Sequence, residues 1–259
     1  MTANLRAMRF SFHQQWKLTF TPYDLSFPVL TALAPAIGAG WVVGRSDNPV
    51  AMSYVFVGAA LMSMWTLGVF YTGWALANEH FQGTLDLLMT TRTPVVLIVF
   101  GKALAILAWQ LPASVASFLI VLAFARGDTS VAEPALLLLS GLIATVAVVA
   151  ISFIFAPIGY LTGARNGWFA ALMPLGSAIS GFLYPIGLLP AAVEAVAKCI
   201  PSSWAMEAVV KSANGTSTSA VLTDWALTFL LIAGYLVVTV VLFRIAEDQA
   251  RRTGSLIRI

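Results

Sequence analysis

The chain has 259 residues, of which 59% are hydrophobic and only 10% are charged, and its mean hydropathy is +0.89. A typical soluble domain carries about 25% charged residues, so the composition excludes an ordinary soluble protein and indicates an all-α membrane protein that crosses the bilayer several times. The net charge is only +3, and no basic stripe with interleaved aromatic residues is present. Binding to nucleic acid is therefore not expected.

The first 20 residues have the pattern of an amphipathic helix. Apolar residues recur at three- and four-residue spacing, and basic residues occupy other faces: Leu5, Met8, Phe12, Trp16 and Phe20 against Arg6, Arg9, His13 and Lys17. We expect an N-terminal surface helix on the inner leaflet, with its basic face toward anionic lipid. A solvated N-terminal helix is the alternative. Residues 1–24 lack the apolar core of a secretory signal, so no cleavage is expected.

Six stretches are long and apolar enough to cross a bilayer, which takes roughly 20 residues. They are residues 26–44, 52–77, 95–125, 134–162, 168–189 and 224–245. The third would reach about 46 Å as a helix, so we expect its first turns, around Lys102, to stand in the headgroup region. The sequence thus predicts a single transmembrane domain over residues 1–259.

The positive residues predict the orientation of these spans. The two termini and the connections after the second and fourth spans hold 10 Lys and Arg residues, whereas the opposite side holds four. Positive residues concentrate on the cytosolic side, so we expect both termini and residues 78–94 in the cytosol.

The segment between the fifth and sixth spans is too broken and too charged to cross the membrane. Residues 190–223 have Ala and Val at helical spacing, interrupted by Pro201. We expect two short helices dipping into the outer leaflet, which is possible where protein or water satisfies the backbone. An ordinary outer loop is the alternative.

Catalytic and metal-binding motifs are missing from the sequence. It has one cysteine, Cys199, and two distant histidines, His13 and His80, and it contains no zinc-protease motif, phosphate-binding loop or nucleophile elbow. We therefore expect no metal, no cofactor and no catalysis in this chain. Lys102 is the one charge well inside a predicted span, so an ion relay across the membrane is not expected either.

The segment "NEHFQGTLDLLMTTRTP", residues 78–94, places charges between two apolar spans. A short cytosolic helix here could sit in a cleft of a soluble partner, where Glu79 and Asp86 would meet basic groups. Gly83 would allow close backbone approach or a break in the helix. Movement of the partner would then tilt the attached spans.

This segment resembles the one after the second span in permease subunits of type-2 ATP-binding-cassette exporters. The matching residues are Glu79, Gly83, Thr84, Leu85, Asp86, Thr93 and Pro94, whereas Gln82 replaces the family's usual basic residue. The resemblance implies that they couple the permease to its ATPase. A second stretch is similar to the family's outer signature, at Ser180, Gly181, Tyr184, Pro185, Pro190, Pro201, Trp204 and Glu207.

The resemblance implies two permease chains, identical or homologous, working with two nucleotide-binding ATPase subunits in a bacterial inner membrane. ATP and magnesium would be bound by those partners. The expected cargo is a hydrophobic or amphiphilic drug, antibiotic or lipid, as in multidrug resistance. Trp65, Phe70, Trp74 and Trp109 are candidates for an aromatic route for it, and the alternative is that they face lipid or the bundle core, as such residues more often do. The alternatives are a polysaccharide or glycolipid exporter, a membrane-embedded lipid-modifying enzyme, and an assembly or anchoring subunit without transport.

Overall fold

The computed structural model describes residues 2–19, 49–84, 93–124, 132–162 and 168–252, with seven residues between 30 and 41. These residues form helices and turns and contain no strand. The helices are α1 (Thr2–Thr19), α3 (Pro49–Phe81), α5 (Val95–Phe124), α6 (Pro134–Thr162), α7 (Trp168–Ile179), the 3-10 turn η2 (Ile186–Leu188), α8 (Ala191–Lys198), α9 (Pro201–Ala213) and α10 (Thr218–Arg252). Most of the predicted first span, 26–44, lies outside the described residues.

Three of the described helices are long and apolar enough to cross a membrane. The qualifying segments are Val95–Ser117, Pro134–Thr162 and Thr218–Ala250. They correspond to the predicted third, fourth and sixth spans, and α6 has the predicted bounds of the fourth. The chain is therefore a membrane-embedded helical protein, because such apolar helices bury their surface only in lipid or against one another.

Helix α3 is at the centre of the bundle and packs against α5, α6, α7 and α9. The main hydrophobic core joins α3 to α6 and α9 through residues such as Leu61, Trp65, Ala147 and Val209. Two glycines let other elements approach α3 closely. A Cβ on Gly58 would lie 1.7 Å from the Phe182 carbonyl oxygen, and a Cβ on Gly68 would lie 2.7 Å from Ser152 Oγ. Small residues permit this close packing between membrane helices.

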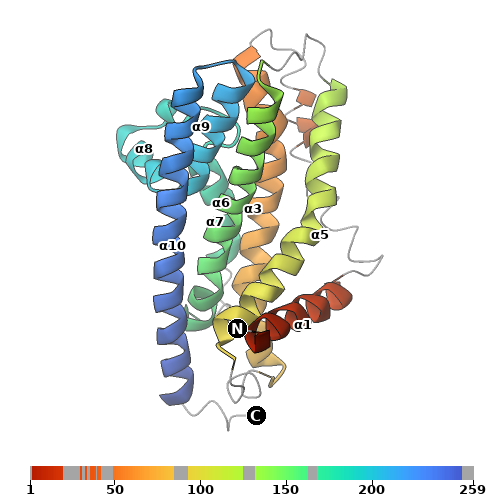
Figure 1. Cartoon of the computed structure of the whole chain (residues 1–259), viewed down its shortest axis with the longest axis vertical. Coiled ribbons are helices and arrows are strands. Elements are labelled where there is room, and N and C mark those ends of the chain that lie inside the picture. The colour runs from red at the N-terminus through yellow and green to blue at the C-terminus, as the bar shows by residue number, and fades with distance from the viewer. Residues whose placement is uncertain are drawn as a thin grey trace.

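The long helices run between two opposite ends of the bundle, and the shorter helices lie at one end or the other (Figure 1). Helix α1 crosses the lower end of α5, where α3 and α10 also end. Helices α8 and α9 lie at the other end. We call these the α1 end and the α9 end. In the described helix α1, Arg6, Arg9, His13 and Lys17 are exposed, and so are the apolar residues Leu5 and Phe10, whereas Ser11 is buried against α5. The predicted role of α1 as an amphipathic surface helix on the inner leaflet therefore stays a prediction.

The predicted fifth span, 168–189, is not one continuous helix. Helix α7 ends at Ile179, and Gly181 then adopts a positive φ of 67°, which is open to glycine but strained for other residues. Pro185 precedes η2. The prediction was wrong here because it counted apolar residues through this turn, and hydropathy alone does not register a change of backbone direction.

The segment after η2 forms two short helices, as predicted. Pro190 precedes α8, and Pro201 is the first residue of α9. Proline suits the first turn of a helix because the missing N–H would have had no partner there. Pro201 therefore separates α8 from α9, whereas Pro190 marks the start of α8.

Candidate functional site

Helix α3 ends in a glycine cap at the α1 end. Gly83 has a φ of 69°, and the Thr84 N–H donates to the Glu79 carbonyl oxygen at 3.0 Å. This six-to-one hydrogen bond around a left-handed glycine is the pattern of a Schellman motif. Of the two alternatives that the sequence left open at Gly83, close backbone approach or a break in the helix, the structure has the break, at the end of α3.

The cap sets the position of the Thr84 side chain. Thr84 Oγ1 lies 2.5 Å from Glu79 Oε2 and 3.2 Å from the Glu79 carbonyl oxygen. A hydroxyl has one proton to donate, and the shorter contact favours the carboxylate as its acceptor. Gly83 thereby places Thr84 as a partner of the Glu79 side chain.

The other carboxylate oxygen of Glu79 pairs with Lys102. Lys102 Nζ in α5 contacts Glu79 Oε1, and this ion pair links α3 to α5. Glu79 is 8% exposed and Lys102 is 5% exposed. Removing either partner would leave a buried charge uncompensated, which is costly. We call Glu79, Thr84 and Lys102 the inner cluster.

Helix α1 is attached to α5 beside the inner cluster. Ser11 Oγ donates to the Ile98 carbonyl oxygen at 2.7 Å, one helical turn before Lys102. Gly101, which directly precedes Lys102, has no side chain, so the backbone of α1 can approach α5 closely at this point. A Cβ on Gly101 would lie 2.5 Å from the Met8 carbonyl oxygen. Helices α1, α3 and α5 therefore meet at one corner of the bundle.

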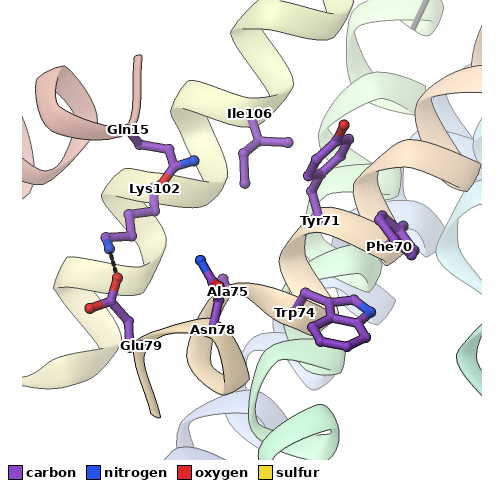
Figure 2. A pocket seen from close by; sticks show the side chains of 9 residues that line it. All are labelled: Gln15, Phe70, Tyr71, Trp74, Ala75, Asn78, Glu79, Lys102 and Ile106. Carbon is purple, nitrogen blue, oxygen red and sulfur yellow. Dashed lines mark hydrogen bonds and ion pairs between the residues drawn. The ribbon is translucent and has the colours of Figure 1, made fainter. Parts of the chain in front are cut away.

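This corner contains a cavity of about 330 Å³ (Figure 2). It is lined by residues from those three helices: Gln15, Phe70, Tyr71, Trp74, Ala75, Asn78, Glu79, Lys102 and Ile106. The inner cluster thus supplies two of the cavity's lining residues.

The structure brings together three of the five predicted coupling residues. Thr84 contacts Glu79 directly, and Gly83 makes the turn that brings them together. Glu79 belongs to the last turn of α3, not to a separate crossing helix. Leu85 and Asp86 lie outside the described residues. The predicted coupling helix therefore stays a prediction, and so do the roles of all five residues.

The predicted outer signature forms the turns at the α9 end. Tyr184 Oη donates to the Ala178 carbonyl oxygen at 2.5 Å, which ties the turn back to α7. Trp204 Nε1 donates to the Lys198 carbonyl oxygen at 2.8 Å, which ties α9 to the end of α8. These two hydrogen bonds stabilise the turns of the segment that contains Pro185, Pro190 and Pro201.

Glu207 belongs to an ionic group at the same end. Lys211 Nζ lies 3.6 Å from Glu207 Oε2 and 2.7 Å from Asp224 Oδ2, and Asp224 is 2% exposed. Burial raises the pKa of the Glu207 carboxyl, and Lys211 opposes that rise. The group joins α9 to the first turns of α10. One ammonium is shared here by two carboxylates.

The predicted aromatic route divides into two environments. Trp65 and Trp109 are 3% and 1% exposed and pack inside the bundle. Phe70 and Trp74 instead line the cavity. The four side chains therefore do not line one continuous surface of this chain, and their part in transport stays a prediction.

Sequence reasoning missed several polar partners. It named Lys102 as an exception but did not pair it with Glu79, 23 residues earlier. It also passed over Gln110, which is 1% exposed and lies against α3. With its amide turned so that both groups are satisfied, its nitrogen donates to the Met64 carbonyl oxygen at 3.2 Å and its oxygen accepts from the Gly68 amide at 3.3 Å. A polar residue inside an apolar span was the available signal.

The fold and the site define an integral membrane helical protein in which the ion pairs of the described residues lie near the two ends of the bundle. Residues 26–241 match the family model described as "ABC-2 family transporter protein". The match covers most of the chain, so the chain belongs to this family of transporter membrane components, as the resemblance implied. A comparison with curated proteins found no match.

Proposed function

We propose that the chain is the permease subunit of an ATP-driven exporter, energised by separate ATPase subunits. Its family supports this role, since a membrane component of an ABC transporter works with an ATP-binding partner. The observation that carries the proposal is the inner cluster, which joins the end of α3 to α5 directly before the segment that resembles the family's coupling sequence.

The cluster would let a push on residues 79–94 move several helices together. Glu79 holds α3 to α5, and Ser11 and Gly101 hold α1 to α5. Packed helices respond to a local push by small rigid-body shifts. ATP and magnesium would bind only to the ATPase subunits, and closure of two such subunits would drive a pair of permease chains, each with six spans and cytosolic termini, in a bacterial inner membrane.

The proposed cargo is a hydrophobic or amphiphilic compound such as a drug, antibiotic or lipid. Lys102, within the candidate span Val95–Ser117, is paired with Glu79, so this part of the described bundle offers no net charge to a cargo. A charged solute would lose its hydration without gaining a counter-charge there. Apolar and amphiphilic compounds lose less.

The test is reconstitution of the permease with its ATPase in proteoliposomes. We expect co-purification of the two, and we expect Glu79→Gln and Thr84→Val to retain ATP hydrolysis while export of a fluorescent amphiphile falls about tenfold, as for loss of a charge-assisted hydrogen bond. Thr66→Val is the matched control, since the Thr66 hydroxyl bonds only to the Met62 carbonyl oxygen of its own helix.

Two results would contradict the proposal. Normal export by both variants would remove the inner cluster from coupling. Export without any ATPase, or a reaction catalysed by the purified chain alone, would contradict the permease role itself.

A further inference from the structure

The cavity between α1, α3 and α5 has the features of a ligand site. Its volume of about 330 Å³ falls at the lower end of the range for small-molecule sites, roughly 300–1,000 Å³. It accommodates a head group and the adjoining part of an amphiphile, but not a whole lipid.

One wall of the cavity is aromatic. Phe70 stacks edge-to-face on Tyr71 with ring centroids 5.5 Å apart and lies 6.3 Å from Trp74. In Figure 2 these rings lie together on the side of the cavity away from Lys102. Phe70 is 36% exposed, so its ring offers apolar surface to an incoming group. Such a surface favours the apolar part of a ligand.

The opposite wall is polar and comes from all three helices. The side chains of Gln15 in α1 and Asn78 in α3 lie beside the Glu79–Lys102 pair (Figure 2). A carboxamide both donates and accepts hydrogen bonds, so the two amides can match hydroxyl, ester or amide groups. The wall is therefore suited to a hydrogen-bonding head.

The charges of the cavity select against a net-charged head. Glu79 and Lys102 neutralise each other in direct contact, and the described lining contains no further charged group. The basic residues of α1, such as Arg9 and Lys17, are exposed and do not line it. A charged head would be desolvated without a free counter-charge.

We propose that this cavity binds an amphiphile with an uncharged, hydrogen-bonding head, whose apolar part lies on Phe70 and Trp74. The head contacts Gln15, Asn78 and the paired charges. Binding of this kind needs no ATPase, so the proposal does not depend on the exporter role.

Photolabelling of the full chain in nanodiscs tests it. The probes are three matched diazirine acyl compounds: a monoacylglycerol, a lysophosphatidic acid and an acylcholine, with uncharged, anionic and cationic heads. We expect the monoacylglycerol to label peptides covering residues 70–78 and 102–106 in a saturable way. Its labelling should be about fivefold stronger than that of either charged probe, which corresponds to the free energy of about one hydrogen bond.

Matched variants locate the site. We expect Trp74→Ala to weaken labelling about tenfold and Gln15→Ala or Asn78→Ala about fivefold. Gln14→Ala and Gln82→Ala are the controls, because these neighbouring side chains are exposed and do not line the cavity. Circular dichroism of each variant verifies that the helices are retained.

Competition distinguishes the source of the ligand. Protection by unlabelled long-chain monoacylglycerol alone supports a ligand from the bilayer, and protection by water-soluble octyl glucoside as well supports one that also enters from solution. Labelling that does not saturate, that is equal for all three heads, or that is unchanged in Trp74→Ala and Asn78→Ala overturns the proposal. None of these results depends on ATP hydrolysis or export.

Discussion

Lys102 in α5 and Glu79 at the end of α3 form a buried ion pair, and Thr84 contacts the remaining oxygen of the carboxylate. The arrangement satisfies both charges although both residues are buried. It also makes each partner dependent on the other, because a single buried charge is far less favourable than a pair.

Breaking this pair from one side should destabilise the bundle more than removing both charges. We expect Lys102→Met to lower the free energy of unfolding by roughly 3 kcal/mol and Glu79→Gln/Lys102→Met to recover part of that loss. Unfolding in SDS, followed by circular dichroism, measures both. Additive losses in the double variant would mean that the two side chains do not interact.

Replacing Gly83 should strain the cap of α3. A Cβ there meets nothing within 4 Å, so the cost of Gly83→Ala arises from the positive φ alone and amounts to roughly 1 kcal/mol. Gly141→Ala is the control: it has equal space but lies within a helix, where alanine is favoured. The same SDS titration compares them, and equal effects of the two substitutions would contradict the role of the cap.

Substitutions at Gly101 should displace α1 from α5. Gly101→Ala puts a Cβ 2.5 Å from a backbone oxygen, which requires α1 to shift, whereas Ser11→Ala removes one hydrogen bond worth about 1 kcal/mol. We expect faster amide hydrogen exchange across residues 2–19 in both variants, and more in Gly101→Ala. Unchanged exchange in Gly101→Ala would show that α1 is held elsewhere.

The ionic group at the α9 end should make stability depend on pH. The folded protein raises the pKa of Glu207 above its ordinary value of 4.5, chiefly through burial. Protonated Glu207 is therefore favoured in the fold, and its contribution is full below pH 4.5 and lost as the pH rises through the raised pKa. We expect Glu207→Gln to be more stable than the parent at pH 7 and to lose this dependence.

Asp224→Asn provides the contrasting variant. Asp224 is the nearer partner of Lys211 and is almost fully buried, so its loss should destabilise the fold at neutral pH. Thermal unfolding in detergent between pH 4 and pH 8 distinguishes the two variants. If Glu207→Gln kept the pH dependence of the parent, another group would be responsible for it.

The sequence was sufficient for elements whose information is local. The apolar run after Pro134 predicted α6 with its bounds, and Pro201 predicted the division between α8 and α9. The end of α7 was missed, because the turn at Gly181 lies in a run as apolar as the helix before it.

The site was predictable only in part, for a physical reason. Gly83 and Thr84 lie within five residues of Glu79 in the sequence, so a local motif contains them. Lys102 and Gln15 reach the same corner only through the rotation and height of α5 and α1 relative to α3. The rotation and height of these helices depend on close contacts such as the one at Gly101, and the spacing of apolar residues in the sequence does not reveal such contacts.

The contact between Gly58 and the Phe182 carbonyl oxygen has a mechanical consequence. It lies 21 residues before Glu79 on the same helix, about 32 Å away at 1.5 Å per residue. Helix α3 is thus held near both of its ends, at Gly58 by the Phe182 backbone and at Glu79 by Lys102. A movement of α3 at Glu79 would therefore also move its contact at Gly58, because one stiff helix connects the two positions and no intervening side-chain contacts are needed.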